Sequence, residues 1–390
     1  MGHKIISAFE SRFGHPPEIV TRAPGRVNLL GGHTDYNDGY VLPTAVSRTA
    51  WVAAAPLTER EIRIHALDLD RDVAFSLDTL PPPQGDWADY PRGVAWALQE
   101  RGLRLVGMEA TLTSNVPVGA GLSSSAAVEM ALAYTWQQLS GFEIDGATTP
   151  IEIRRGLAVI CQRAENDYVG VNCGIMDQLT SALGVEGHVL LLDCRTLEMK
   201  LAPLPLDAAI IAVDTGVRRQ LANSEYNMRR AQCEEAVSLL SEHLPNIRAL
   251  RDVSAGDLER LKKRLPQVIY RRAHHVVTEN ARTLRAAEAL QEGDVDAVGA
   301  LMKAGHISLR DDYEVSGPEL NALAEAAWEV DGCYGARLTG AGFGGCIVAL
   351  VAAEATSDFE AHVSAAYESA FDRLPDVYIC RSIDGVKVLV

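Results

Sequence analysis

Apolar and polar positions along the chain follow two different periods, which separates strand-like from helix-like segments. Short runs rich in β-branched residues and bounded by Pro or Gly predict strands over 19–30 and 41–55, with a polar loop at 31–39 between them. Further strands are predicted over 108–116, 188–193, 207–214, 346–353 and 377–390. We expect the last segment to form a hairpin at Asp384-Gly385, because Asp-Gly is a typical two-residue hairpin turn.

Helix-like spacing dominates the second half of the chain. Between 266 and 292, apolar residues recur three or four positions apart, at Ala273, Val277, Ala281, Leu284 and Ala287. Helices are predicted over 89–101, 126–139, 150–169, 223–243, 256–264, 266–292, 294–310 and 317–329. Strands and helices mix in both halves, which indicates an α+β chain of two domains at 1–190 and 191–390.

Composition narrows the class of protein. The chain has 390 residues, of which 47% are hydrophobic and 23% charged, so it can bury a large core divided between two domains. Its formal net charge of −16 opposes binding to nucleic acid or to an anionic membrane surface. A local basic pocket could still hold phosphate groups.

Cysteine usage and the first residues favour a cytoplasmic protein. The seven cysteines are odd in number and include no CxxC pair, which is typical of reduced thiols rather than of a disulfide framework or a zinc site. Lys4, Glu10 and Arg12 interrupt the region where a signal peptide would need an apolar core. The longest apolar runs fall far short of the roughly 20 residues that span a bilayer.

A glycine and serine segment at 119–125 is the strongest candidate for an anion site. It follows a predicted strand and opens a helix, so backbone N–H groups and the helix dipole would face a phosphate. We expect the serines to cap and begin that helix. The chain lacks GxxxxGK[ST] and the protein-kinase HRD and DFG motifs, and a capped core helix after a tight turn is the alternative. The candidate phosphate-binding residues are Gly119, Ala120, Gly121, Leu122, Ser123, Ser124 and Ser125.

A second glycine cluster, GARLTGAGFGG, occupies 335–345. It satisfies GxGxxG at 340, 342 and 345, but it runs directly into a predicted strand instead of opening a helix. A dinucleotide-binding interpretation is therefore excluded. Two interpretations remain open: close backbone approach to a ligand, or a turn that only serves packing.

Three segments together resemble a known enzyme family. PGRVNLLGGHTDY at 24–36, GAGLSSS at 119–125 and the cluster at 335–345 resemble the three ordered motifs of the GHMP small-molecule kinases. Within that family, the first motif, CGIMDQ at 173–178 and SEY at 224–226 resemble the galactokinases. The resemblance covers the chain from about residue 10 to 390.

The resemblance implies a fold and an activity. It implies an N-terminal domain of the ribosomal-protein-S5-domain-2 type, a C-terminal α+β GHMP domain, and an active site between them. The implied reaction uses ATP and Mg²⁺ to phosphorylate the anomeric C1 hydroxyl of galactose, giving galactose 1-phosphate. The sequence carries no direct signal of oligomeric state, and we expect a monomer.

The resemblance also assigns catalytic and metal-binding roles. Asp177 matches the catalytic carboxylate and Arg26 the cation beside it. Because a neighbouring Arg favours the ionised carboxylate, we expect Asp177 to act more by aligning the hydroxyl than by basicity. Ser125 and Glu165 match the ligands of Mg²⁺, and both are hard oxygen donors. The alternatives are a solvated helix position for Glu165 and an inter-strand salt bridge for Arg26.

Sugar and nucleotide contacts follow from the same comparison. Trp87 and Tyr90 match positions near the adenine pocket, with ordinary core aromatics as the alternative. A lone His or Tyr is more often a packing residue, so the sugar assignments depend on the motifs around them. The implied sugar-binding residues are Gly32, His33, Thr34, Asp35, Gly174, Asp177 and Tyr226.

One position departs from the pattern. Galactokinases typically carry Glu where this chain has Gly32, so the carboxylate that contacts the C6 hydroxyl is missing. A sugar that differs from galactose at C6, such as L-arabinose or galacturonate, is therefore an alternative substrate. A galactokinase-like sugar sensor without turnover is a further alternative.

Overall fold

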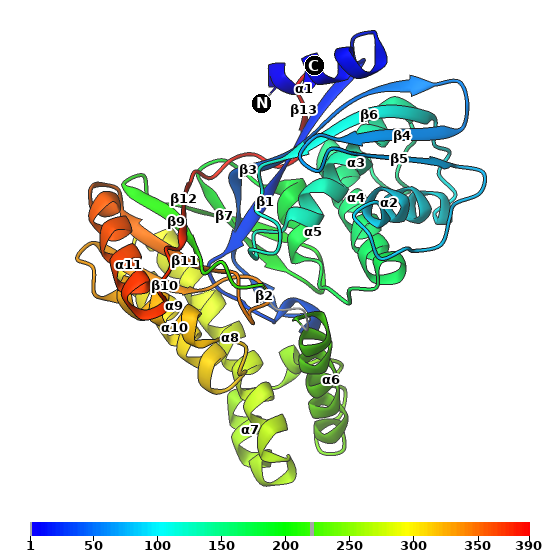
Figure 1. The fold of residues 1–390 in the computed structure, drawn as a ribbon. Helices are drawn as coiled ribbons and strands as arrows, with labels where there is room; N and C mark the ends of the chain where they lie inside the picture. Colours follow the sequence, from blue (N-terminus) through cyan, green and yellow to red (C-terminus); the bar gives the residue numbers. More distant parts are fainter. Residues whose placement is uncertain (1, 219–221) are drawn as a thin grey trace.

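The structure is a computed structural model that describes residues 2–218 and 222–390, without the side chains of 222–224. Figure 1 shows two parts, one built from the blue-to-green segments and one from the green-to-red segments. Each part combines a sheet with helices, which confirms the expected α+β class.

A six-stranded sheet forms the first part, in the order β13-β1-β3-β6-β4-β5. All its pairs are antiparallel except β4 with β6. Helix α1 packs on one face through Ile5 and Phe9, while α3 packs on β1 and β3 from the other. The strands are β1 (Ile19–Asn28), β3 (Pro43–Leu57), β4 (Glu61–Ala66), β5 (Arg71–Ser76), β6 (Gly107–Ser114) and β13 (Lys387–Val388). The helices are α1 (Gly2–Phe13), α2 (Asp89–Glu100), α3 (Ser124–Ser140), α4 (Pro150–Arg163) and α5 (Met176–Leu183).

The second part contains a four-stranded sheet in the order β10-β11-β9-β12. Its strands are β9 (Ala208–Asp214), β10 (Cys333–Leu338), β11 (Cys346–Ala352) and β12 (Asp376–Cys380). Its helices are α6 (Ala222–Ser241), α7 (Ala255–Leu261), α8 (Gln267–Glu292), α9 (Val295–Asp311), α10 (Pro318–Trp328) and α11 (Thr356–Phe371). A three-stranded sheet adjoins α8 and consists of β2 (Tyr40–Val41), β7 (His188–Asp193) and β8 (Met199–Pro203).

The predicted segments agree with the structure in most places. Predicted helix 150–169 ends in a π-helical turn, η2 (Ala164–Val169), a type of irregularity that often marks a functional site. The other short helical turns are η1 (Asp35–Asn37), η3 (Leu250–Asp252), η4 (Lys262–Arg264) and η5 (Ala353–Ala355). Sequence reasoning missed α1, β4, β5, α5, β8, β10 and α11.

The predicted hairpin at Asp384-Gly385 is wrong. Strand β12 pairs with β9 in the second sheet, whereas β13 pairs with β1 in the first. The Gly385 amide donates to Gly184 O at 2.8 Å, and a Cβ at 385 would lie 2.5 Å from Ala182 O. Gly385 thus permits close backbone packing as the chain returns to the first part, where Figure 1 places both chain ends.

The domain limits at 1–190 and 191–390 stay a prediction.

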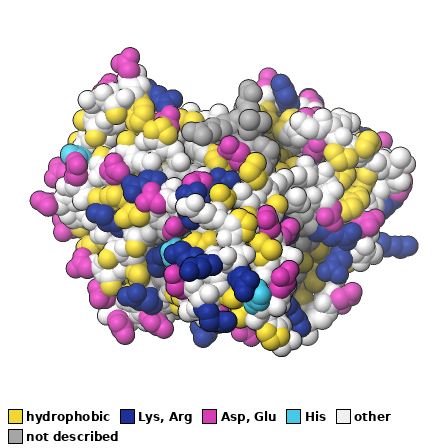
Figure 2. Space-filling view, turned by 90° about the horizontal axis from the view of Figure 1, so that it is seen from below, with side chains coloured by type: hydrophobic (Ala, Val, Ile, Leu, Met, Phe, Trp, Pro, Cys, Tyr) yellow, Lys and Arg dark blue, Asp and Glu magenta, His cyan; other side chains and the backbone are white. Residues whose placement is uncertain are grey.

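The surface and the helices carry two further observations. Figure 2 shows acidic and basic side chains interspersed over one face, so the basic side chains there do not form one continuous surface. Among the described residues, no helix combines the length and the apolar content that a bilayer crossing requires. All seven cysteines are free thiols, as expected.

Candidate active site

A buried guanidinium holds the centre of the site together. Arg26, on β1, donates from Nε and Nη2 to the two carboxylate oxygens of Asp177 at 2.8 and 2.7 Å. Its third nitrogen, Nη1, donates to Gly121 O at 2.6 Å. The Arg26 side chain is 5% exposed and that of Asp177 24%, so the carboxylate remains reachable while its partner does not. The two predicted catalytic residues therefore lie in one bidentate pair.

Ser123 has a different role from the predicted helix cap. It occupies the cap position of α3 with φ of 61° and ψ of 51°, a left-handed conformation that residues other than Gly seldom adopt. Its side chain makes no capping hydrogen bond, and instead Ser123 Oγ donates to Asp177 Oδ2 at 2.5 Å. The unusual backbone thus turns the hydroxyl toward the catalytic candidate, and strain of this kind often marks a functional site.

The third glycine motif packs backbone to backbone against the segment at 119–125. A Cβ at Gly340 would lie 2.8 Å from Gly121 Cα, and a Cβ at Gly345 would lie 2.9 Å from Ala120 O. On the other side, a Cβ at Gly25 would lie 2.4 Å from Leu122 O. The three motifs therefore meet at distances that only glycine allows, which favours the packing interpretation of 335–345.

The loop after β1 presents the Asp35 carboxyl. Burial, followed by the charge of Asp177, raises the pKa of Asp35 to about 6. A Cβ at Gly174 would lie 1.9 Å from Asp35 Oδ2, so the glycine leaves room for this carboxyl. Thr34 Oγ1 donates to Gly31 O at 2.8 Å, so it stabilises the loop from within.

His33 orders the same loop. Its φ is 64°, and burial lowers its pKa to about 3, so the ring is neutral. Nε2 donates to Ala341 O at 3.0 Å, since a carbonyl can only accept, and Nδ1 accepts from Tyr36 Oη at 2.7 Å. Both ring nitrogens are therefore engaged within the protein. The Tyr226 ring lies 5.6 Å from the His33 ring.

Helix α8 fixes the loop from the other part of the molecule, which sequence reasoning missed. Glu279 Oε1 accepts from the amides of Gly31 and Gly32 at 2.8 and 3.2 Å, and from Arg337 Nη1 at 2.6 Å. His275 Nε2 donates to Gly32 O at 2.9 Å. Burial alone would raise the pKa of Glu279, but the charges of Arg337 and Arg282 hold it well below its usual range. The helical periodicity of 266–292 placed α8, but periodicity carries no information about these long-range partners.

The predicted metal ligands lie beside each other. Glu165 is 6% exposed, and burial, followed by the Asp177 charge, raises its pKa. The Ser125 hydroxyl adjoins this carboxyl and acts in the opposite direction through a hydrogen bond. No group of three or more His, Cys, Asp or Glu among the described residues is arranged to hold a metal ion. One carboxyl and one hydroxyl fit Mg²⁺ that takes its remaining ligands from phosphate oxygens and water.

These groups enclose a cavity of about 160 Å³. The value is below the roughly 300–1,000 Å³ of drug-sized pockets, which favours a small polar ligand. Most of its lining comes from the first motif at 24–36, the cluster at 335–345 and the 173–178 segment, and no residue of 119–125 lines it. The lining residues are Arg26, Asn28, Gly32, His33, Asp35, Glu165, Val171, Cys173, Gly174, Met176, Asp177, Tyr226, Gly340 and Ala341.

Comparison with known proteins identifies the family. A model described as the galactokinase galactose-binding signature matches residues 7–56. Models described as the GHMP kinases N terminal domain and GHMP kinases C terminal match 89–185 and 286–369. The galactokinase of Roseiflexus sp. (strain RS-1) is 47% identical over 383 residues, 98% of this chain and 96% of that one. The chain belongs to the galactokinase family.

Solved structures agree with this assignment. The Lactococcus lactis galactokinase complexed with galactose superposes with a TM-score of 0.93 at 33% identity, covering 98% of both chains. A mevalonate kinase superposes with a TM-score of 0.64 at 17% identity, covering 94% of this chain and 100% of that one, and shows the fold alone. The predicted two-domain GHMP kinase fold is confirmed.

Neither of the two aromatics predicted to lie near the nucleotide lines the cavity described above. Trp87 precedes α2 and is half-buried against the first core, and Tyr90 lies within α2. Burial, followed by the charges of Glu165 and Glu129, raises the pKa of Tyr90, so its phenol lies near the metal-side carboxyl. A contact of either residue with adenine stays a prediction, as do the individual sugar contacts.

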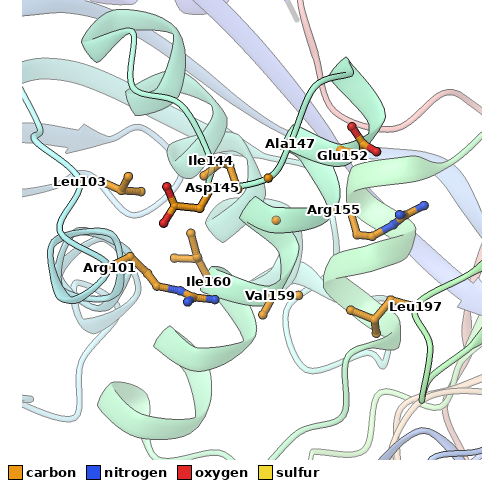
Figure 3. A pocket seen from close by; sticks show the side chains of 12 residues that line it. Arg101, Leu103, Ile144, Asp145, Ala147, Glu152, Arg155, Val159, Ile160 and Leu197 are labelled. Atoms are coloured by element: carbon orange, nitrogen blue, oxygen red, sulfur yellow. The ribbon is translucent and has the colours of Figure 1, made fainter.

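Figure 3 shows a second, larger hollow of about 390 Å³ from close by. It is lined by the end of α2, the loop after α3 and helix α4, and it shares no lining residue with the first cavity. One acidic lining residue, Glu152, is already engaged in the capping box of α4. The hollow has no part in the site described above.

From the raised pKa of Asp35 we expect the free energy of unfolding to depend on pH. Its folded pKa of about 6 exceeds the ~3.9 of an unfolded Asp, so the folded state holds the proton more tightly. The stability that the protonated Asp35 contributes to the fold is fully present below about pH 4 and is lost as the pH rises through about 6. Because Asn cannot ionise, Asp35→Asn should unfold at a higher urea concentration than the wild type at pH 7.5. The two midpoints should converge near pH 4.

The exposed Asp167, whose partner is Arg163, supplies the control. Asp167→Asn should shift the midpoint little at either pH, as expected for a surface pair. An equal advantage of Asp35→Asn at pH 4 and pH 7.5 would mean that ionisation is not the cause.

Proposed function

We propose that this protein transfers the γ-phosphoryl group of ATP to the C1 hydroxyl of galactose, with Mg²⁺, and releases galactose 1-phosphate and ADP. The observation that carries this is the Arg26–Asp177–Ser123 cluster, which adjoins both the loop at 31–35 and the segment at 119–125. The galactose complex of the L. lactis relative supports the choice of sugar.

Asp177 would orient the attacking hydroxyl. Two of its hydrogen bonds come from Arg26 and one from Ser123, so the carboxylate is fixed before a sugar arrives. Phosphoryl transfer depends mainly on alignment and charge stabilisation, and the hydroxyl proton can leave late. Asp177 then accepts that proton as the new P–O bond forms.

The phosphates would lie against Gly119, Ala120, Gly121, Leu122, Ser123, Ser124 and Ser125. Helix α3 begins at Ser124, so its free amides and the positive end of its dipole support an anion there. Ser125 and Glu165 would hold Mg²⁺, which supplies positive charge to the phosphate oxygens when bound. Trp87 and Tyr90 would lie near the adenine.

Sugar recognition requires directed hydrogen bonds in the small cavity. Asp35 would accept from ring hydroxyls, Gly174 would donate through its backbone, and Tyr226 would offer its hydroxyl. Gly32, His33 and Thr34 would shape the wall through the loop that α8 holds.

We further infer a cytoplasmic monomer that acts on a sugar and ATP, without nucleic acid or membrane as a partner. The net charge of −16 supports the last part, because polyanions would repel most of such a surface.

A coupled assay of ADP release tests the function. ADP should appear only with Mg²⁺ and a galactose-configured sugar together, and phosphorus NMR should place the phosphate at C1. Phosphate at C6, or ADP release that no sugar stimulates, would refute the proposal. Sugar and ATP binding without any turnover would instead favour a sensor.

Asp177→Asn should retain sugar binding while losing most turnover. The amide oxygen can still accept a hydrogen bond, but the side chain cannot take the proton and no longer balances the Arg26 charge. A loss of at least a hundredfold in kcat, or about 2.7 kcal/mol in the barrier, is expected. Calorimetry measures sugar affinity alongside the rate. Near-normal turnover would remove Asp177 from the mechanism, and the exposed Asp167→Asn is the control.

Gly32 favours broad acceptance at C6, the second candidate function. Without a carboxylate there, the charge-assisted hydrogen bond to a C6 hydroxyl is absent, and so is repulsion of galacturonate. Gly32→Glu should raise kcat/KM for galactose over L-arabinose and galacturonate by about tenfold, the value of one such bond.

Gly32→Ala is the matched control. Any side chain at 32 places a Cβ 3.0 Å from Arg337 Nη2, and Ala adds that atom alone. Ala tests that crowding without adding a carboxylate, and its ratios among the three sugars should stay those of the wild type. Unchanged ratios in Gly32→Glu would mean that another residue reads C6.

A further inference from the structure

A fully buried carboxyl, Glu129, lies behind the metal-side residues and has no role in the function proposed above. It lies on α3, one helical turn after Ser125, and its side chain is 0% exposed. Within the described part of the chain, Glu129 forms no ion pair with any Arg, Lys or His. Burial, followed by the charge of Glu165, raises its pKa well above the usual range.

Such a group is costly for the fold. A buried carboxyl without a cation loses its hydration and gains little in return, so an apolar residue would stabilise α3 more. One oxygen, Glu129 Oε1, has no hydrogen-bond partner at all, and neither has Gln178 Oε1. Stability does not account for an acid at this position, and costly groups of this kind gather at functional sites.

A single amide joins Glu129 to the metal side. Gln178 Nε2 donates to Glu165 Oε2 at 2.7 Å and to Glu129 Oε2 at 3.1 Å. A primary amide has two protons, so these two shorter bonds can take both of them, and Cys173 Sγ lies farther from Nε2, at 3.9 Å. Glu129 therefore fixes the plane of the Gln178 amide, and that amide fixes the Glu165 carboxyl.

The same amide is tied to the catalytic carboxylate through the backbone. Gln178 follows Asp177 directly in the first turn of α5, and it is 0% exposed. A shift of this turn would therefore move both residues at once: Asp177, which is proposed to orient the sugar hydroxyl, and Gln178, which donates to Glu165. The arrangement sets the metal side and the sugar side at a fixed separation.

We propose that Glu129 is a positioning residue for the metal-binding carboxyl of Glu165 and acts through the Gln178 amide. This inference rests on the proposed function, because it concerns the Mg²⁺ that ATP brings. Partners of this kind behind a metal ligand typically change metal affinity by about 10–100-fold when removed.

The test measures metal binding rather than turnover. Mn²⁺ replaces Mg²⁺, and electron paramagnetic resonance follows its binding in the presence of galactose and a non-hydrolysable ATP analogue. Glu129→Met, which keeps the length of the side chain but removes the acceptor, should weaken Mn²⁺ affinity about tenfold. Galactose affinity without metal, measured by calorimetry, should change less than twofold.

Two variants separate positioning from other roles. Glu129→Gln keeps an oxygen that accepts from Gln178, so it should recover most of the Mn²⁺ affinity. Gln178→Met should weaken Mn²⁺ affinity about as much as Glu129→Met does. The variant that combines both substitutions should bind Mn²⁺ no more weakly than Gln178→Met alone, because Glu129 acts through Gln178. Glu143→Met, at an exposed glutamate after α3, is the control.

Several outcomes would overturn the inference. Mn²⁺ affinity within twofold of wild type in Glu129→Met would do so. Equal losses in Glu129→Gln and Glu129→Met would do so as well, because they would show that an oxygen accepting from Gln178 is not what Glu129 contributes. Losses that multiply in the double variant would show independent roles. If Glu129→Met fails to fold, unchanged affinity in Gln178→Met decides against it. A wild type that binds no metal–nucleotide or releases no ADP refutes the proposed function instead.

Discussion

The bidentate pair between Arg26 and Asp177 is the interaction on which the site depends. A guanidinium that is 5% exposed needs its donors satisfied. Strand β1 carries the Arg26 side chain, and two other segments satisfy its donors: α5 supplies the Asp177 carboxylate and Gly121 supplies a carbonyl. Without α5 the buried guanidinium would lose its carboxylate partner, and without Gly121 O one of its nitrogens would lose its acceptor. The segment at 119–125 and the Asp177 carboxylate are thus positioned by one planar group, whose fork geometry a Lys could not reproduce.

Glycine allows these segments to come together. At Gly25, Gly121 and Gly340, a Cβ would lie within 3 Å of backbone atoms of a neighbouring motif. Backbone atoms cannot rotate away as side chains can, so any substitution there would separate the segments. Contact between the motifs thus explains the glycines at these three positions.

The sequence predicted the pairing of Arg26 with Asp177 but not the long-range partners of Ser123, Glu279 and Glu129. Arg26 and Asp177 were assigned from local motifs, and the structure places them in direct contact. Ser123 was expected as a cap, because Ser before a helix usually is one, and its left-handed backbone could not be read from composition. Glu279 and Glu129 were missed, since an acid within a helical pattern usually faces solvent.

The contacts of α8 explain how position 32 can lack a side chain. The amides of Gly31 and Gly32 bond to Glu279, and Gly32 O accepts from His275, so the path of the loop is fixed by its backbone. No side chain at 32 contributes to that geometry. A side chain at 32 would instead meet Arg337, whose Nη2 would lie 3.0 Å from the new Cβ. We therefore expect a substitution there to act on recognition at C6 more than on the chemistry at C1.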